Sequence, residues 1–318
     1  MSRGLPSRIA IIGSNGYLGS RLVAKLVERS EVELVLGVGR RPLSRLVLPK
    51  FHYCSLPGDS LTSKLLKHRI TSVVYLAFIS CPTHDESAAY RTNVLNTATL
   101  LEAVGRASIK EVVLISSVAV YGPGPRMRPA TETDAPNANG FQFSQHKVLQ
   151  EQVAWQQSKC VGFELTILRP CTVVGPGASN FLLACLGRAI VPLPAGANPD
   201  WQFLHEEDFC EVVIAVLQRG LRGVYNVVPD DAIPIRQAIR LLGSKPISVP
   251  KQLLFIIAKL GWSSHLQKLV PAPPSALDFL CSAPVASNSA IREVLNFEFR
   301  YHSREAVQTV QHSLRGLT

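Results

Sequence analysis

Three glycines near the start of the chain, Gly13, Gly16 and Gly19, have the GxxGxxG spacing of a phosphate-binding turn. They follow a short apolar run, residues 9–12, which predicts a buried strand. They overlap the start of a segment, residues 18–27, whose apolar residues recur at helical intervals. Glycine lets the backbone turn tightly and approach a pyrophosphate, whose charge is stabilised by amides at the helix N-terminus. The pattern therefore predicts a dinucleotide site.

The end of the next predicted strand, residues 32–38, indicates which dinucleotide binds. NAD-binding units have an acidic residue about 20 positions past the last glycine, where it holds the ribose hydroxyls. This chain has Gly39 there, followed by Arg40 and Arg41. Two guanidinium groups would bind a ribose 2′-phosphate through charge-assisted hydrogen bonds. We therefore expect NADP(H) in preference to NAD(H), and the alternative for this pair is a solvated basic turn.

Length and composition indicate a globular protein. The 318 residues suit one large domain or two closely joined ones. No stretch approaches the roughly 18 uninterrupted apolar residues of a membrane span, and the first residues do not have the pattern of a signal peptide. The seven cysteines include no CxxC pair, which is typical of reduced thiols and does not indicate a metal site. We expect a cytoplasmic protein without stable insertion into a membrane and without a bound metal.

Strand and helix patterns alternate through the first half of the chain. After the first unit, strands are predicted at residues 72–77, 112–115 and 165–168, and helices at residues 61–68, 86–106 and 141–159. This alternation predicts an α/β fold, a Rossmann-type doubly wound parallel sheet whose ligands bind beyond the carboxyl ends of the strands. We expect residues 1–174 to form this dinucleotide-binding domain. The proline-rich residues 175–318 would form a smaller substrate-covering portion that returns one strand, residues 223–228, to the sheet.

Several motifs, in the right order, resemble the extended short-chain dehydrogenase/reductases, the group of NAD(P)-dependent epimerases and dehydratases typified by UDP-galactose epimerase. GSNGYLG is similar to the family's glycine motif, and YLAF to its HLA-type segment after the fourth strand. NVLNTATLLEA resembles the asparagine-containing helix that follows, and LISSVAVYG the strand that carries the catalytic serine. LRPCTVVGPG resembles the RPxxVYGPG segment, and FLHEEDF the FxHVxD segment. The resemblance covers nearly the whole chain.

The resemblance implies a catalytic serine, tyrosine and lysine, of which this chain keeps two. Ser117 matches the serine, and Lys147 matches the lysine. In the family the tyrosine exchanges a proton with the reacting oxygen, the lysine lowers the phenol pKa and holds the nicotinamide ribose, and the serine polarises that oxygen. The tyrosine position holds Phe143, and none of the seven tyrosines has a lysine four residues later. Phe143 keeps the ring and loses the acid, and we expect it to pack over the nicotinamide site.

The other expected site residues come from the same motifs. Besides the three glycines, the arginine pair and Lys147, the resemblance implies cofactor contacts from Asn15, Tyr17, Leu18, Leu76, Ala77, Phe78, Pro170 and Val173. It implies substrate contacts from Ser117, Val118, Phe143, Cys81, His84 and Trp201. Trp201 stands where the UDP-sugar epimerases have a pyrophosphate-binding arginine, which an indole cannot replace. We therefore favour a hydrophobic substrate, and a core position for Trp201 is the equal alternative.

Other side chains are candidates for supplying the missing proton. His84 lies in the loop after predicted strand 72–77 and titrates near neutral pH, although an ordinary loop histidine is the simpler interpretation. We expect His146 to be a surface residue, Cys171 a small buried thiol and His205 a structural residue.

Cofactor motifs beside a changed proton relay predict an atypical NADP(H)-binding enzyme that reduces, oxidises, isomerises or cyclises a hydrophobic small molecule. A non-catalytic NADP(H) sensor or scaffold is the alternative, favoured by Phe143 and disfavoured by the retained Ser117 and Lys147. Residues 232–291 carry six Lys or Arg against one acid and include apolar residues 253–260, which leaves a peripheral membrane protein as a third hypothesis. The Lys and Arg residues of this region occur singly along the chain, a pattern that does not indicate a nucleic-acid partner. By analogy with the family, we expect a homodimer formed through the two long helices.

Overall fold

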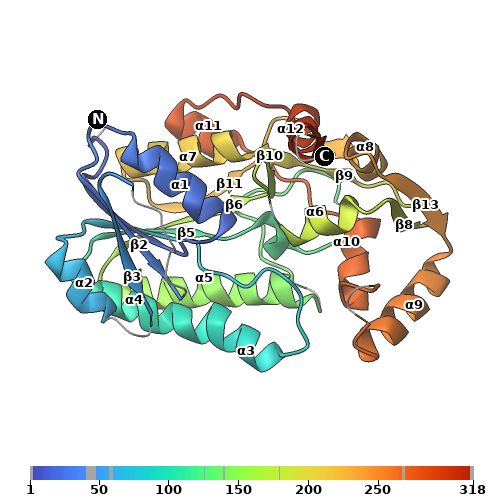
Figure 1. Ribbon diagram of the computed structural model, residues 1–318, viewed down its shortest axis with the longest axis horizontal. Coiled ribbons are helices and arrows are strands. Elements are labelled where there is room, and N and C mark those ends of the chain that lie inside the picture. Colours follow the sequence, from blue (N-terminus) through green and yellow to red (C-terminus); the bar gives the residue numbers. More distant parts are fainter. Residues whose placement is uncertain are drawn as a thin grey trace.

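A sheet of seven parallel strands forms the centre of the molecule (Figure 1). The computed structural model describes residues 3–40, 48–56, 60–124, 126–138, 140–178, 180–266 and 269–315. The strands lie in the order β11-β6-β5-β4-β1-β2-β3, and each neighbouring pair is parallel. They are β1 (Arg8–Ile12), β2 (Leu34–Gly39), β3 (Phe51–Ser55), β4 (Ser72–Tyr75), β5 (Glu111–Ile115), β6 (Glu164–Pro170) and β11 (Gly223–Val227). The expected doubly wound α/β fold is confirmed.

Alternate residues of β1 face opposite sides of the sheet, and both sides are buried. Ile9 and Ile11 belong to one apolar core, and Ala10 and Ile12 to the other. A strand covered on both faces has no place for a polar residue, which explains its continuous apolar run.

The second strand begins two residues later than the sequence predicts. The Val32 amide donates a hydrogen bond to the Arg29 carbonyl oxygen at 3.2 Å. That bond belongs to the turn after the first helix, so the parallel ladder with β1 starts only at Leu34.

Helices cover both faces of the sheet (Figure 1). On the upper face in this view lie α1 (Tyr17–Val27), α7 (Glu206–Arg219) and α11 (Ser289–Leu295). On the lower face lie α2 (Leu61–Lys67), α4 (Asn96–Arg106) and α5 (Gln142–Val161). The predicted helix 86–106 consists of α3 (Glu86–Tyr90), a π-helical turn η1 (Arg91–Leu95) and α4, without a break between them.

The C-terminal part of the chain builds smaller elements around a third apolar core. Its short strand pairs are β7 (Thr172–Val174) with β10 (Phe203–His205), β9 (Asp200–Trp201) with β12 (Ile233–Pro234), and β8 (Ile190–Pro194) with β13 (Lys245–Val249). Its helices are α6 (Phe181–Leu186), α8 (Ile235–Leu241), α9 (Lys251–Ser263), a 3-10 turn η3 (Pro274–Ala276), α10 (Leu277–Cys281) and α12 (Ser303–Arg315). Among the described residues, no helix has the length and apolar character needed to cross a membrane.

Candidate cofactor and substrate site

The glycine turn joins β1 to α1, and close contacts explain two of its glycines. Gly13 has a φ of 93°, and a Cβ built there would lie 2.7 Å from the backbone nitrogen of Ala77. A Cβ on Gly19 would collide with the Gly13 carbonyl oxygen, because α1 packs directly on the turn. Gly16 is the N-cap residue of α1, and no side chain caps this end. These contacts require glycine at two positions of the turn, which we name the glycine cradle. The uncapped amides at the start of α1 are of the kind that bind a pyrophosphate.

At the end of β2, a tyrosine and an asparagine occupy the place of the usual acidic residue. The hydroxyl of Tyr53, on the neighbouring strand β3, accepts a hydrogen bond from Asn15 Nδ2 at 2.8 Å. A Cβ on Gly39 would lie 2.5 Å from that hydroxyl, so a larger residue there would displace the Tyr53 side chain. Arg40 is exposed beside this pair, and Arg41 lies outside the described residues. The end of β2 therefore presents neutral donors and a cation where NAD-binding units have a carboxylate.

Lys147 lies within α5 with only 5% of its surface exposed. Its Nζ donates to the Ile115 carbonyl oxygen at 2.8 Å and to Gln150 Oε1 at 3.1 Å. It also lies 3.8 Å from the ring centroid of Phe78, which is a cation–π contact. Burial lowers the pKa of Lys147 to about 7, and the negative charge of Glu151 opposes this shift. The lysine is thus held at the carboxyl end of β5, beside the segment that follows β4.

Phe143 lies one helical turn before Lys147 and belongs to an aromatic cluster. Its ring centroid is 5.3 Å from that of Phe78, in a T-shaped arrangement, and 6.2 Å from that of Phe141. Phe141 contacts Phe279 of α10 at 5.6 Å. Residues four apart share one side of a helix, so Phe143 and Lys147 both meet Phe78. The four rings cannot donate a proton, and they form an apolar wall beside the lysine.

Ser117 is half-buried immediately after β5. Its Oγ accepts a hydrogen bond from the Ala119 amide at 3.1 Å and so caps the 3-10 turn η2 (Val118–Tyr121). Val118, the next residue, is buried. Since Oγ acts as an acceptor here, its own hydrogen can still donate to the oxygen of a substrate.

One turn after Lys147 on α5, a buried polar network begins that the motifs do not reveal. Arg169 of β6 pairs with Glu151 through two bonds, of 2.9 Å from Nε and 2.6 Å from Nη2. Ser116 donates to the same carboxylate, and Arg169 Nη1 donates to the Tyr121 hydroxyl at 3.0 Å. The Tyr121 hydroxyl donates in turn to Asn226 of β11 at 2.8 Å. The network ties α5 to β6, to β11 and to the segment that follows β5, and thereby fixes the helix that carries Phe143 and the lysine.

Glu151→Gln is expected to lower the free energy of unfolding by about 3 kcal/mol, because it leaves the Arg169 guanidinium buried without a counter-charge. Urea unfolding followed by circular dichroism measures the change. Arg106→Gln is the control, since it breaks an exposed i,i+4 pair with Glu102 and should leave the midpoint unchanged. Equal midpoints for both variants would contradict the structural role of the network.

The other predicted cofactor residues lie at or near the carboxyl ends of the strands. Leu76 and Ala77 directly follow β4, Pro170 ends β6, and Val173 lies in β7. The Tyr17 hydroxyl donates to the Glu206 carboxylate, and burial raises the pKa of this tyrosine. Leu18 packs on the core below α1. Tyr17 therefore fastens the start of α1 to the start of α7.

The predicted substrate loop after β4 packs against α9. The His84 ring stacks between Trp262 and His265, at centroid distances of 4.0 and 4.1 Å. Its Nε2 is buried and has no hydrogen-bond partner among the described residues. Cys81, in the same loop, is exposed. The stacking brings the loop of the sheet domain against the C-terminal part.

Trp201, which the sequence left between substrate site and core, is 8% exposed and packs in the third core beside Phe203. Cys171 is buried, as expected, and burial raises the pKa of its thiol. His205 is structural, as expected: its Nδ1 accepts the amide of Glu207 at 3.2 Å and caps α7.

The expectation of a surface position for His146 is wrong. The residue is 7% exposed, and its Nδ1 lies 3.3 Å from Nδ2 of Asn93. Asn93 belongs to the π-helical turn η1 and also bonds both backbone groups of Ile79. Because η1 packs on this side of α5, His146 is buried against η1, whereas its neighbour Lys147 is buried against other partners.

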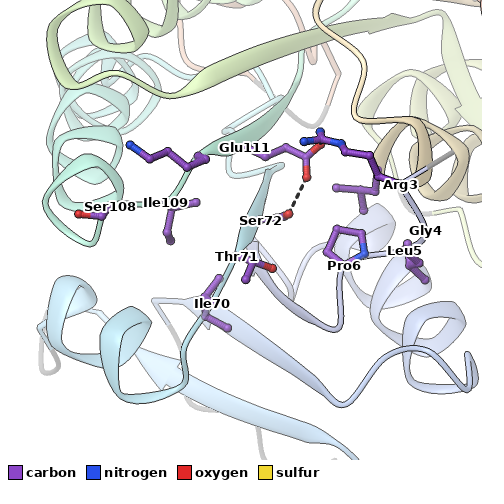
Figure 2. Close-up of a pocket in the computed structure, with 12 residues that line it drawn as sticks. Arg3, Gly4, Leu5, Pro6, Ile70, Thr71, Ser72, Ser108, Ile109 and Glu111 are labelled. Carbon is purple, nitrogen blue, oxygen red and sulfur yellow. Dashed lines mark hydrogen bonds and ion pairs between the residues drawn. The ribbon is translucent and has the colours of Figure 1, made fainter. Parts of the chain in front are cut away.

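A separate cavity of about 380 Å³ opens at the other edge of the sheet (Figure 2). It is lined at the amino ends of β4 and β5, where Ser72 Oγ donates to Glu111 at 2.6 Å and Arg3 bonds the same carboxylate at 3.3 Å. Ligands of parallel α/β sheets bind at the carboxyl ends of the strands. By this rule a ligand is expected at the opposite edge, where the glycine turn, Ser117 and Lys147 lie.

Comparisons with other proteins agree with this geometry. Residues 9–227 match the NAD dependent epimerase/dehydratase family. The chain is 24% identical over 324 residues to an uncharacterized protein of Mycobacterium tuberculosis, covering 98% of this chain and 85% of that protein. It is 25% identical over 276 residues to sterol demethylase protein B of Methylococcus capsulatus, covering 79% and 80%. The solved UDP-glucose 4-epimerase of Thermus thermophilus, in complex with NAD, has a TM-score of 0.76 at 20% identity and covers 98% of this chain and 100% of its own.

The chain belongs to the NAD dependent epimerase/dehydratase family. Its fold is that of enzymes which bind a nicotinamide dinucleotide, and the glycine cradle fits such a group. Sequence reasoning missed Tyr53 and the pair of Glu151 with Arg169. Tyr53 could have been found from its place on the strand beside Gly39. The pair could have been found from its two opposite charges, which lie in segments expected to be buried.

Proposed function

We propose that the chain is an NADP(H)-dependent enzyme of this family that acts on a hydrophobic small molecule with an altered proton relay. One observation carries the proposal. On one side of α5 the buried Lys147 is retained, while Phe143 stands in the place of the tyrosine that would supply the proton. Retention of the lysine and of Ser117 supports a reacting oxygen at this place, because in the family these two groups hold the nicotinamide ribose and polarise that oxygen. Phe143 and its neighbouring rings support an apolar substrate.

Several of the chain's own groups would hold the cofactor. The amides of the glycine turn would hold the pyrophosphate, Arg40 and Arg41 the 2′-phosphate, and Lys147 the nicotinamide ribose. When bound, the dinucleotide donates or accepts a hydride. Ser117 would donate to the oxygen of the substrate, and Phe143 and Phe78 would keep water from it.

Two further observations support a hydrophobic substrate. Trp201 stands where a sugar-nucleotide enzyme has its phosphate-binding arginine, so the chain lacks that contact to a sugar nucleotide. One relative is named a sterol demethylase protein, and a sterol is an apolar alcohol. We therefore propose an apolar alcohol or ketone as the substrate class.

Arg40→Ala is expected to weaken NADPH binding by about tenfold and to leave NADH binding unchanged, because it removes a charge-assisted contact with the 2′-phosphate. Titration calorimetry with both cofactors measures the effect. Arg106→Ala, which removes an exposed cation far along the chain on α4, is the control. Equal losses for NADPH and NADH would contradict the assignment of this edge to the 2′-phosphate.

The alternative function is a dinucleotide-dependent sensor without turnover, and Phe143 is the feature that favours it. The purified chain is therefore assayed with NADPH and a panel of hydrophobic ketones, and in reverse with NADP and the alcohols. Turnover supports the enzyme. Tight NADPH binding without turnover of any compound supports the sensor.

We also propose a cytoplasmic homodimer. All seven cysteines are free thiols, as in reducing compartments. Leu95 and Trp155 are exposed large apolar residues of η1 and α5, the pair of helical segments through which family members are expected to associate.

A further inference from the structure

Helix α9 has an exposed apolar face in addition to the face that it buries. Leu254 and Ala258 are buried. Leu253, Ile256, Ile257 and Leu260 are between 47% and 64% exposed. Their i, i+3, i+4 and i+7 spacing places these four side chains in one stripe, which we name the α9 face. Single exposed leucines are ordinary on protein surfaces, whereas a stripe of four on one short helix is not.

The apolar surface continues beyond the helix. Leu266 and Leu269, in the turn that follows α9, are 51% and 73% exposed. Ile190 of β8 is 55% exposed, and β8 packs beside α9. In Figure 1, α9 lies at the outer end of the C-terminal part, away from the seven-stranded sheet. The apolar stripe therefore faces outward from one end of the molecule.

Cations border this surface. Lys251 and Lys259 are exposed on α9, and Lys245 is exposed on β13. Arg188 donates to the Leu269 carbonyl oxygen at 3.0 Å, which holds a fourth cation beside the turn. From residue 232 to residue 277 the sequence contains no Asp or Glu. This segment of the chain thus carries cations and no acid.

We propose that the α9 face docks onto the surface of an anionic lipid bilayer. Aliphatic side chains would enter the boundary between headgroups and acyl chains, while the lysines at the rim would pair with anionic headgroups. A protein interface is typically enriched in aromatic and arginine residues and depleted in lysine. The α9 face has four aliphatic residues, and the exposed cations of its helix are lysines, which favours lipid over a protein partner.

Docking would hold the loop after β4 about one helix thickness from the bilayer, because His84 stacks on Trp262, which lies on the side of α9 opposite to the stripe. An apolar substrate dissolved in the bilayer would then be close to the loop that we expect to border the substrate site. This consequence rests on the proposed function, whereas the docking itself does not.

Sedimentation of the full-length chain with large vesicles tests the proposal. One set of vesicles contains phosphatidylcholine alone. The other contains phosphatidylcholine with about 30% phosphatidylserine, which makes the surface anionic. We expect binding to the anionic vesicles that falls as salt is raised, and weak binding to the neutral ones. The double variant Ile256→Glu with Ile257→Glu should bind at least about tenfold more weakly, since it places two charges in the apolar stripe. Lys251→Gln with Lys259→Gln should lose about fivefold per cation on the anionic vesicles only.

The matched control is Leu66→Glu with Met127→Glu, two other exposed apolar residues whose change adds the same charge elsewhere. It should bind the anionic vesicles almost as tightly as the native chain. Thermal unfolding and NADPH binding of each variant show whether the fold and the cofactor site are intact, so a failure of docking is separate from a failure of the proposed function. No binding of the native chain, or equal losses in the control and the α9 variants, would overturn the proposal. The proposal would also be overturned if the native chain did not bind vesicles and the α9 variant changed from dimer to monomer. In that case the stripe would be the contact surface between two copies of the chain.

Discussion

Phe143→Tyr is expected to raise the rate of NADPH-dependent reduction of hydrophobic ketones by about 10²- to 10⁴-fold. The substitution adds a phenol at the position one turn before Lys147, where both residues meet Phe78. The lysine ammonium would stabilise the phenolate that forms when the proton leaves. Single-turnover assays at saturating NADPH measure the rate of the hydride-transfer step.

The gained rate should also depend on pH. Burial lowers the pKa of Lys147 to about 7, so the ammonium is lost as pH rises through neutrality. Its stabilisation of the phenolate is then lost as well, and the gained rate should fall above pH 7. Phe141→Tyr is the control, since it adds the same hydroxyl to the same aromatic cluster two residues earlier. A similar gain in both variants, or none in either, would show that position 143 is not the missing acid.

Gly19→Val is expected to weaken NADPH binding by about a thousandfold, roughly 4 kcal/mol. The added Cβ would meet the Gly13 carbonyl oxygen and the Ser14 backbone, and β-branching leaves the side chain no other direction. Helix α1 must then move off the glycine turn, which removes its amides from the pyrophosphate. Titration calorimetry gives the dissociation constant for NADPH, and circular dichroism shows whether the variant is folded.

Ala24→Val controls for the cost of a β-branched residue in this helix. Ala24 is exposed on α1, so the same side chain meets no backbone there. Its NADPH affinity should equal that of the native chain. A folded Gly19→Val protein with native affinity would contradict the assignment of this turn to the pyrophosphate and with it the cofactor site.

The sequence by itself determined those elements that depend only on residues close together along the chain. Residues 9–12 had to form a strand buried on both faces, and the glycines had to form the turn, because neighbours along the chain set the apolar period and the tight backbone. The order of the motifs then fixed the parallel sheet. The spacing of Phe143 and Lys147 placed both on one side of α5, and their meeting at Phe78 follows from that spacing once the loop after β4 is in position.

Only the tertiary structure decided the contacts between distant segments. His146 is buried because η1 packs on α5, and no periodicity within α5 indicates that neighbour. The pair of Glu151 with Arg169 depends on α5 crossing β6, and two opposite charges in the sequence do not show that they meet. The stack of His84 on Trp262 joins residues far apart in the chain, so only the packing of α9 against the loop could show it. Local order follows from spacing along the chain, whereas burial and charge pairing follow from which elements the fold brings together.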